Sequence, residues 1–543
     1  MSRPTSSPDA HGARTRAGAA SILLVLVVAA AVAFITLRDL DGTPAGLYID
    51  EVAIALTARS LWETRADLAG NPVPLFPLSF RDNERPIPVN PVYIYTAIPF
   101  ALSGPGGRSA RLPSVLWLWV AAAGIGLCVH ELTRSRAIGF AVGATAALTP
   151  WLFVIGRTGW EAISFPALTS LALWSFLWGS RTKSALAVVA SAALFGLSIY
   201  SYTTARLLVP LTVGAVVLIW LRDGRMRGLL AWMLLVVALM AVPLALYLRQ
   251  NPGVLTWRLE SAIWSDAPPL LDLLGRFAAN YSRYFSPRFL FLEGDTNPRH
   301  GAGQGMLLWI AAPLIVAGCW EAWRRRTERP VRMIVAGLLI APIGAAITTD
   351  GQPHAIRSIT TVLFWAALAG LGCKRLLEIV PRPRIAASIV ALLTAINAAA
   401  FATHYFGAWR ETAFGAFDGG KAIVLREAFA RRGNRPLYVP GPLLTHNRLE
   451  VFVPYWGALP VQQWREAGAS FFGIHPWVGK TPPSGLVVHG WFRESVDGTS
   501  SAVSEWAAAI TPPIRLVGGP PAGARSIFSV EHNGVRLYDI FEK

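Results

Sequence analysis

Charged residues are scarce in this sequence of 543 residues: 15 % are Asp, Glu, Lys or Arg, whereas 53 % are hydrophobic. A soluble chain of this length normally carries about 25 % charge. The apolar residues form blocks of about twenty, long enough to cross a hydrocarbon core of roughly 30 Å. The composition therefore excludes an ordinary soluble protein. Short polar loops between the blocks favour spanning helices over a barrel, whose signal is alternation within ten-residue segments.

Cysteine and internal repetition are also nearly absent. The three cysteines, Cys128, Cys319 and Cys373, lie in or at the ends of apolar runs. They lack metal-ligand spacing, so we interpret them as packed, reduced thiols. No repeat of solenoid period is present, and low complexity is confined to the polar N-terminal tail. The cysteine spacing therefore argues against a metal site, and the lack of repeats argues against a solenoid.

The apolar blocks predict about eleven membrane-spanning helices. The first follows Arg3, Arg14 and Arg16 and lacks a clear cleavage site, so we interpret it as a retained helix and not a signal peptide. The expected spans are residues 18–37, 112–130, 137–155, 163–179, 184–200, 207–221, 228–248, 306–322, 333–348, 358–373 and 385–403.

Basic residues give the expected orientation. Every short loop on one side of this threading is basic, as the positive-inside rule requires of loops that face the cytoplasm. The formal net charge of +17 is therefore largely topological, and no nucleic-acid partner is expected. The residues concerned are Arg134, Arg136, Arg181, Lys183, Arg222, Arg225, Arg227, Arg324, Arg325, Arg326, Arg329, Arg332, Lys374, Arg375, Arg382 and Arg384.

The opposite side receives the longer polar segments. We expect a cytoplasmic tail (1–17), a transmembrane domain (18–405) with outer loops 38–111 and 249–305, and an extracytoplasmic domain (406–543). In the last segment the apolar runs shorten, and Pro436–Pro440, Leu486–Gly490 and Ile527–Phe541 have the pattern of strands, the last a hairpin turning at Asn533-Gly534. A small α/β domain is therefore predicted.

Asp50 and Glu51 stand at the start of a helical pattern just after the first span. One explanation is capping, because acids there accept hydrogen bonds from free N–H groups and suit the helix dipole. The other is catalysis, because a carboxylate beside lipid headgroups is well placed to act as a base.

Arginines gather in the outer loops, against the positive-inside trend. Arg85 follows Glu84 in a proline-rich stretch, and Arg157, Arg206 and Arg357 lie in short polar turns. A single arginine there is explained by snorkelling, but several together suit an anionic group such as phosphate. Glu161, Tyr202 and His354 share these turns.

The second outer loop holds Glu293, Asp295, Arg299 and His300 within eight residues, followed by Gly301, Gly303 and Gly305. This set suits a sugar phosphate or a metal. Because the spacing matches no standard zinc or calcium pattern, metal is the weaker interpretation. A glycine-rich hinge that closes over a substrate is a structural alternative.

Together these motifs resemble the lipid-carrier-dependent glycosyltransferases of the GT-C class, in particular the protein O-mannosyltransferase and aminoarabinose transferase group of glycosyltransferase family 39. The resemblance covers residues 18–405. It is carried by Asp50-Glu51, by Glu84-Arg85-Pro86, by the acid in the turn after the third span, and by the Tyr202–Arg206 turn. The stretches Asn297–Gly301 and Gln352–Arg357 are also similar to bacterial members.

The resemblance implies transfer from a polyprenyl-phosphate-linked sugar to an acceptor hydroxyl, with inversion at the anomeric carbon. Asp50 matches the catalytic aspartate, with Glu51 beside it. Arg85 stands where the family often has a lysine that contacts the lipid phosphate, with Glu84 adjacent. Arg206 and Arg357 would neutralise the leaving phosphate. The expected substrate contacts are Glu161, Arg157, Tyr202, Arg299, His300 and His354.

Several points stay open at this level. The acceptor is a protein, a glycolipid or a glycan, and the C-terminal domain either binds it or acts as a structural lid. No metal or other cofactor is expected. The expected site is the outer face of a bacterial inner membrane. The alternative function is a polytopic transporter or flippase of lipid-linked sugars, although spans nearly free of charge and without paired repeats favour chemistry at the rim.

Overall fold

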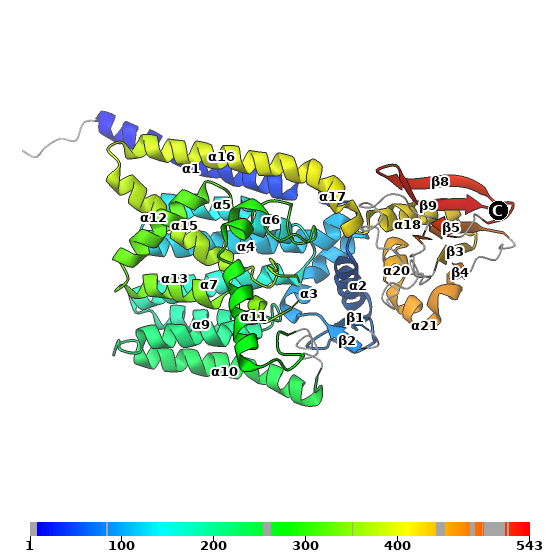
Figure 1. The fold of residues 1–543 in the computed structure, drawn as a ribbon, viewed down its shortest axis with the longest axis horizontal. Coiled ribbons are helices and arrows are strands. Elements are labelled where there is room, and N and C mark those ends of the chain that lie inside the picture. Colours follow the sequence, from blue (N-terminus) through cyan, green and yellow to red (C-terminus); the bar gives the residue numbers. More distant parts are fainter. Residues whose placement is uncertain are drawn as a thin grey trace, which may run out of the picture.

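The apolar blocks fold into helices that lie side by side in one bundle (Figure 1). The computed structural model describes residues 8–82, 85–253, 262–349, 351–440, 451–477, 484–490, 492–493, 516–517 and 521–543. Every expected span falls on a helix or on two consecutive helices, which confirms a helical membrane protein. These helices are α1 (Pro8–Leu37), α4 (Gly107–Thr133), α5 (Arg136–Leu148), α6 (Pro150–Gly156), α7 (Ser164–Thr182), α8 (Ala185–Ser198), α9 (Ala205–Trp220), α10 (Arg227–Gln250), α12 (Ala311–Arg324), α13 (Arg329–Ile340), α14 (Ile343–Ala346), α15 (Thr361–Ile379) and α16 (Pro383–Phe406).

Length and composition alone identify fewer spans than the sequence pattern does. Within the described residues, five helical segments are long and apolar enough to cross a membrane, or six if the bent pair α5–α6 counts as one. The two helices of that pair meet at 57°. Pro150 explains the bend, because proline opens α6 and has no N–H to continue the ladder of α5. The number of eleven spans therefore stays a prediction.

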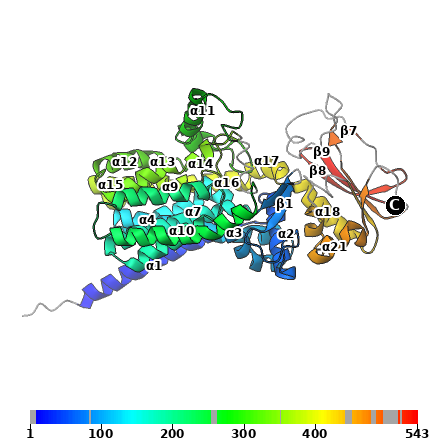
Figure 2. The ribbon, with the colours of Figure 1, turned by 90° about the horizontal axis from the view of Figure 1, so that it is seen from below.

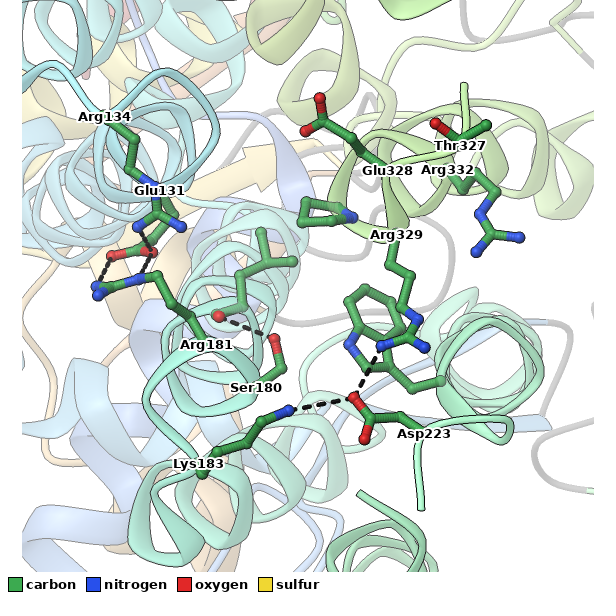
Figure 3. A pocket seen from close by; sticks show the side chains of 13 residues that line it. Glu131, Arg134, Ser180, Arg181, Lys183, Asp223, Thr327, Glu328, Arg329 and Arg332 are labelled. Carbon is green, nitrogen blue, oxygen red and sulfur yellow. Dashed lines mark hydrogen bonds and ion pairs between the residues drawn. The ribbon is translucent and has the colours of Figure 1, made fainter. Parts of the chain in front are cut away.

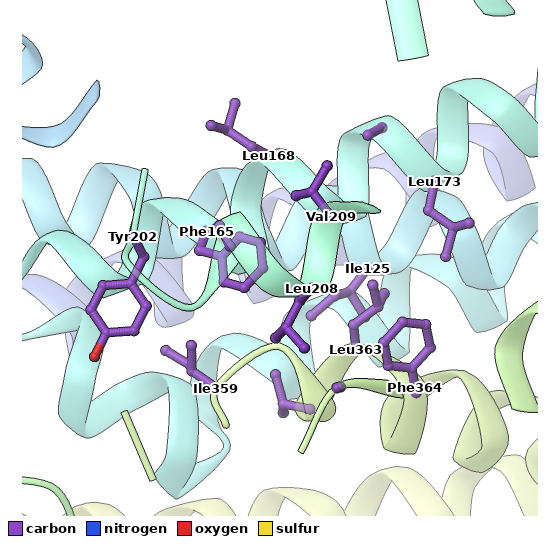
Figure 4. Close-up of a cluster of buried hydrophobic side chains, with 14 of the residues drawn as sticks. Ile125, Phe165, Leu168, Leu173, Tyr202, Leu208, Val209, Ile359, Leu363 and Phe364 are labelled. Atoms are coloured by element: carbon purple, nitrogen blue, oxygen red, sulfur yellow. The ribbon is translucent and has the colours of Figure 1, made fainter. Parts of the chain in front are cut away.

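The core of the bundle lies where α4, α7, α9 and α15 meet. Figure 4 shows Ile125, Phe165, Leu208 and Leu363, one from each of these helices, packed against one another, and all four are buried. Glycines bring α4 and α5 close: a Cβ on Gly126 would lie 2.7 Å from the carbonyl oxygen of Gly139. Such close backbone approach is typical of helices that pack in a membrane.

One end of the bundle carries the folded outer loops. The first loop contains α2 (Ile49–Thr64), the β1–β2 hairpin (Leu78–Asp82 and Arg85–Pro88), α3 (Pro91–Ala97) and the 3-10 helix η1 (Ile98–Ser103). The second contains the amphipathic helix α11 (Leu270–Arg283) and one π-helical turn, η4 (Arg288–Leu292). A short 3-10 turn, η2 (Glu161–Ile163), precedes α7. Figures 1 and 2 show α2, α3 and the C-terminal domain at this end.

The C-terminal segment forms the predicted small α/β domain. Its five-stranded sheet has the order β4-β3-β5-β9-β8, with β3 parallel to β4 and β5, and β9 antiparallel to β5 and β8. The three predicted strand regions fall on β3, β5 and the β8–β9 hairpin, which turns at Asn533-Gly534 with positive φ at both residues. The elements are α17 (Ala408–Ala416), α18 (Gly419–Arg432), β3 (Leu437–Pro440), α20 (Phe452–Trp456), α21 (Val461–Phe471), β4 (Ile474–Trp477), β5 (Leu486–Gly490), β8 (Arg525–His532) and β9 (Val535–Glu542), with a short pair β6 (Phe492–Arg493) and β7 (Leu516–Val517).

This domain packs directly on the first outer loop. Ile49 and Val52 of α2 share one buried apolar cluster with Val424 of α18 and Val453 of α20. Polar contacts join the same surfaces, because the Tyr455 hydroxyl donates to the carbonyl of Gly106 at 2.9 Å. Helix α2, which carries Asp50 in its first turn, is therefore held between the bundle and the C-terminal domain.

Candidate active site at the outer end of the bundle

Asp50 lies in the first turn of α2 and is half-buried. Tyr48 is the N-cap of this helix, and its backbone N–H donates to Glu51 Oε2 at 3.0 Å. Glu51 therefore supplies the capping hydrogen bond that the capping explanation attributed to this acidic pair. Asp50 also lies in this first turn, where the helix dipole favours a carboxylate.

Glu51 is buried in an ion pair with Arg111 at the start of α4. Its side chain is fully buried and accepts from Arg111 Nε at 2.9 Å and from Nη2 at 3.2 Å. The N–H of Gly159 donates to the same carboxylate at 2.8 Å. With the N–H of Tyr48, four donors converge on two oxygens. Arg111 was not identified from the sequence, although an arginine beside the outer end of a span is the signal that could have found it.

Arg157 is enclosed by backbone carbonyl groups. It is fully buried, and its guanidinium donates to the carbonyls of Thr36 at 2.5 Å, Arg38 at 2.6 Å and Thr43 at 3.1 Å. These carbonyls belong to the chain that leaves α1 and leads towards α2. The expected contact between Arg157 and substrate has no support in this geometry, because the side chain is enclosed and directed at backbone. Its role here is to fix the segment that precedes Asp50.

A second network joins two of the expected site residues through Asn90, the N-cap of α3. Its backbone N–H and side-chain amide donate to the two oxygens of Glu161, both at 2.7 Å. Its carbonyl Oδ1 accepts from Arg206 Nη2 at 2.6 Å. The guanidinium of Arg206 also lies 5.5 Å from the ring centre of Phe76. Asn90 therefore holds Glu161 and Arg206, which are 45 positions apart in the sequence.

A third cluster joins the second outer loop (249–305) and the Gln352–Arg357 turn to the start of α2. The guanidinium of Arg299 lies 4.3 Å from the ring centre of Tyr48, and Trp160 contacts both Tyr48 and His300 edge to face. His300 stacks on His354 with ring centres 4.4 Å apart. Residues from the first outer loop, the α6–η2 turn, the second outer loop and the Gln352–Arg357 turn therefore converge in one place.

Asp295 connects the second outer loop to the Gln352–Arg357 turn. Its Oδ2 accepts from the N–H of Ala355 at 2.8 Å and lies 3.1 Å from His300 Nδ1. Asp295, His300 and His354 each offer one ligand atom within 4.8 Å of the others, so among the described residues this trio could hold a metal ion. The Nδ1 atom of His354 is buried and has no hydrogen-bond partner in the described part of the chain. Arg357 donates to Thr348 Oγ1 at 2.7 Å beside this trio.

Burial and positive neighbours set the charge state of this cluster. The pKa of His354 is well below its ordinary value, first because the ring is buried and then because His300, Arg357 and Arg299 are near. Burial likewise lowers the pKa of His300, although Asp295 opposes the shift. Burial and the charge of Asp50 raise the pKa of Tyr48 to about 12. At neutral pH the site therefore presents two neutral imidazoles, a neutral phenol and two fixed guanidinium charges.

The remaining expected residues divide between the described and undescribed parts of the chain. Tyr202 is buried in the turn before α9, next to the Arg206 network. Arg85 opens β2, where its backbone pairs with that of Asp82. Glu84 lies outside the described residues. The structure thus brings Arg299, His300, His354 and Arg357 together near Tyr48 and Asp50, while Glu161 and Arg206 form the neighbouring Asn90 network.

No protein-family model matches the chain, and a search of curated proteins finds no match. Solved structures do match. ArnT from Cupriavidus metallidurans bound to undecaprenyl phosphate is 12 % identical with a TM-score of 0.55, and the match covers 95 % of this chain and 98 % of that one. The apo form of the same protein gives a TM-score of 0.54 at 15 % identity, with 96 % and 98 % covered.

A third match is the Archaeoglobus fulgidus oligosaccharyltransferase tethered with an acceptor peptide, at a TM-score of 0.50 and 13 % identity. It covers 89 % of this chain and 74 % of that one. These neighbours are GT-C glycosyltransferases. This chain has the GT-C fold. Within that GT-C fold, the outer loops carry the clustered acids, arginines and histidines, and the likeness to ArnT extends through the C-terminal domain because nearly the whole chain is covered.

Proposed function

We propose that the chain is an inverting glycosyltransferase that moves a sugar from a polyprenyl-phosphate donor to an acceptor hydroxyl at the outer face of the membrane. The convergence of the α2 start with two arginine- and histidine-bearing loops carries this proposal. The likeness to a protein solved with undecaprenyl phosphate supports the donor class. The acceptor class is a protein, a glycolipid or a glycan.

In this mechanism Asp50 is the catalytic base. The acceptor hydroxyl attacks the anomeric carbon, its proton passes to Asp50, and the bond between that carbon and the phosphate oxygen breaks on the opposite face. The products are the glycoside, with inverted configuration, and polyprenyl phosphate. Because the phosphate already leaves readily, a base and fixed positive charge suffice for a single displacement.

Arginines of the outer loops hold the phosphate. Arg357 and Arg299 flank the histidine pair, and Arg206 is fixed by Asn90. The family resemblance alone adds Arg85 and Glu84 to this proposed phosphate site. Guanidinium groups suit this task because they bind phosphate oxygens in pairs and stay charged. Glu161, Tyr202, His300 and His354 contact the sugar or its phosphate.

Glu51 has a positioning role in this proposal, in place of the catalytic role that its place beside Asp50 suggested. Four hydrogen-bond donors occupy its two oxygens, so they are not available to take the acceptor proton. Its bond to Arg111 instead fixes the first turn of α2 against α4. Asp50 is thereby held at a defined place at the rim.

The orientation follows the basic loops. The end of the bundle that carries Arg134, Arg181 and Lys183 faces the cytoplasm, and the opposite end faces the periplasm of a bacterial inner membrane. Donor lipid reaches the site from the outer leaflet. No metal is required for the displacement.

Asp50→Asn is the direct test, because asparagine keeps the size and helix-start preference but is not a base. The matched control is Asp272→Asn, which removes an exposed acid from the first turn of α11 at the same end of the molecule. We expect Asp50→Asn to lose transfer by at least 100-fold, on the order of the usual contribution of a general base, while donor binding persists. The control should keep near-native transfer. Near-native transfer by a folded Asp50→Asn variant would place the base elsewhere, and retained binding of donor without turnover in the wild type would favour the flippase alternative.

A further inference from the structure

A cavity of about 530 Å³ lies at the end of the bundle opposite the candidate active site. It opens between the ends of α4, α7 and α9 and the start of α13, and Figure 3 shows its lining. Charged side chains dominate that lining. It therefore differs from the apolar, lipid-facing surface of the helices that surround it.

Each of two carboxylates in this cavity is shared by two cations. Glu131 accepts from Arg134 at 2.7 Å and from Arg181 at 2.9 Å. Asp223 accepts from Lys183 at 3.1 Å and from Arg329 at 2.8 Å, as the dashed lines in Figure 3 show. One carboxylate neutralises only one of its two cations, so each group of three side chains keeps a positive charge.

Arg332 adds a further charge. It also lines the cavity, is exposed, and has no acidic partner among the described residues. The third acid of the lining, Glu328, is paired with Arg325, which lies outside the cavity, at 2.7 Å. The five basic side chains of the lining are therefore balanced by two carboxylates, Glu131 and Asp223, which leaves three positive charges around the cavity.

The cavity lies where charged loops meet lipid-facing helix surface. Trp220 and Leu177 belong to its lining. Near the same helix ends, Leu218 is 76 % exposed and Leu221 is 49 % exposed, as expected of side chains that face acyl chains. A ligand here meets positive charge on one part of its body and hydrocarbon beside it. Free phosphate would use only the positive charge, because it has no apolar part to contact the hydrocarbon.

We propose that this cavity binds the phosphate headgroup of an anionic phospholipid of the inner leaflet. The surplus charge neutralises the headgroup, and its acyl chains lie against the neighbouring apolar helix ends. Clusters of basic residues between membrane helices bind such headgroups through the same combination of charge and depth. The site is independent of the sugar-transfer site, which lies at the other end of the bundle.

The test compares two double variants that remove the same charge from the same end of the molecule. Lys183→Gln/Arg332→Gln removes charge from the cavity, and Asp223 keeps its ion pair with Arg329, so this half-buried acid is not left alone. Arg225→Gln/Arg326→Gln is the matched control, because both arginines are exposed and lie outside the lining. Binding of phosphatidylglycerol, and of phosphatidylcholine with the same acyl chains, is measured by native mass spectrometry of the purified full chain.

We expect wild type and control to retain phosphatidylglycerol in preference to phosphatidylcholine, and the cavity variant to bind phosphatidylglycerol roughly 30-fold more weakly. The charge-preserving variant Lys183→Arg/Arg332→Lys should restore binding, which separates loss of charge from loss of fold. Equal weakening in cavity and control variants would show diffuse attraction and overturn the site. Displacement of the lipid by millimolar inorganic phosphate or pyrophosphate would assign the cavity to a soluble phosphate and overturn the lipid proposal.

Discussion

Glu51→Gln separates the positioning role of Glu51 from the catalytic role proposed for Asp50. Glutamine keeps the size of the side chain but replaces one carboxylate oxygen with an NH₂ group. If the remaining oxygen faces Arg111 Nε and Gly159 N, the new NH₂ faces the N–H groups of Arg111 Nη2 and Tyr48. Two hydrogen bonds are then replaced by donors that face donors, and the Arg111 charge loses its counter-ion.

The size of the effect follows from burial. Both side chains of the Glu51–Arg111 pair are 0 % exposed, so solvent cannot replace what is lost. Removing one partner of such a pair costs about 3–5 kcal/mol of folding free energy. The matched control is Glu63→Gln near the other end of α2, where the ion pair with Arg59 is partly exposed. A pair of that kind contributes less than about 1 kcal/mol.

The assay is unfolding in mixed micelles with increasing SDS, measured alongside sugar transfer under native conditions. We expect Glu51→Gln to unfold at clearly lower SDS than wild type, Glu63→Gln to resemble wild type, and Asp50→Asn to keep wild-type stability while losing transfer. A Glu51→Gln variant with wild-type stability and no transfer would refute the positioning role and return Glu51 to the chemistry.

Three further predictions address other parts of the site. Asn90→Ala removes the side-chain hydrogen bonds from Asn90 to Glu161 and Arg206, so we expect donor affinity to fall about tenfold, the equivalent of roughly 1.4 kcal/mol, in a titration with labelled donor; unchanged affinity would contradict the role of this network. Arg157→Lys cannot reach all the carbonyls that the guanidinium holds, so we expect stability to fall by roughly 3 kcal/mol in the SDS assay, and an unchanged midpoint would count against the structural role. Treatment with EDTA should leave transfer unchanged, and a loss of transfer that Zn²⁺ restores would show that the two histidines and the aspartate of the outer loops hold a functional metal.

The helical bundle was predictable because each spanning helix leaves a long apolar block in the sequence. Each apolar block of the sequence became one helix or two consecutive helices, and Asn533-Gly534 marked the β8–β9 hairpin because few other residue pairs accept two positive φ values. The bend between α5 and α6 was missed although Pro150 stands at the break. Helix α11 was not predicted either, because its apolar residues recur between polar ones along one face and form no continuous block.

The site was only partly predictable because the partners in its networks come from distant segments. The sequence indicated Arg299, His300 and His354 as substrate contacts, and these do lie together. It gave no reason to pair Glu51 with Arg111, which is 60 positions away, or to place Asn90 between two charged side chains. Such pairings depend on how the helices pack, which local patterns do not encode. The burial of Arg157 against backbone was not evident for the same reason, since its acceptors are carbonyls and any sequence could supply them.

Transfer of a labelled sugar is the measurement that tests the central claim most directly. Purified full chain in lipid would be incubated with polyprenyl-phosphate sugars that carry a radiolabel, with protein, glycolipid and glycan acceptors offered in turn. The account predicts that label moves to one class of acceptor with release of polyprenyl phosphate, and that the new glycosidic bond has the inverted anomeric configuration. Neither binding nor turnover of any donor across the panel, by a protein that is folded, would contradict it.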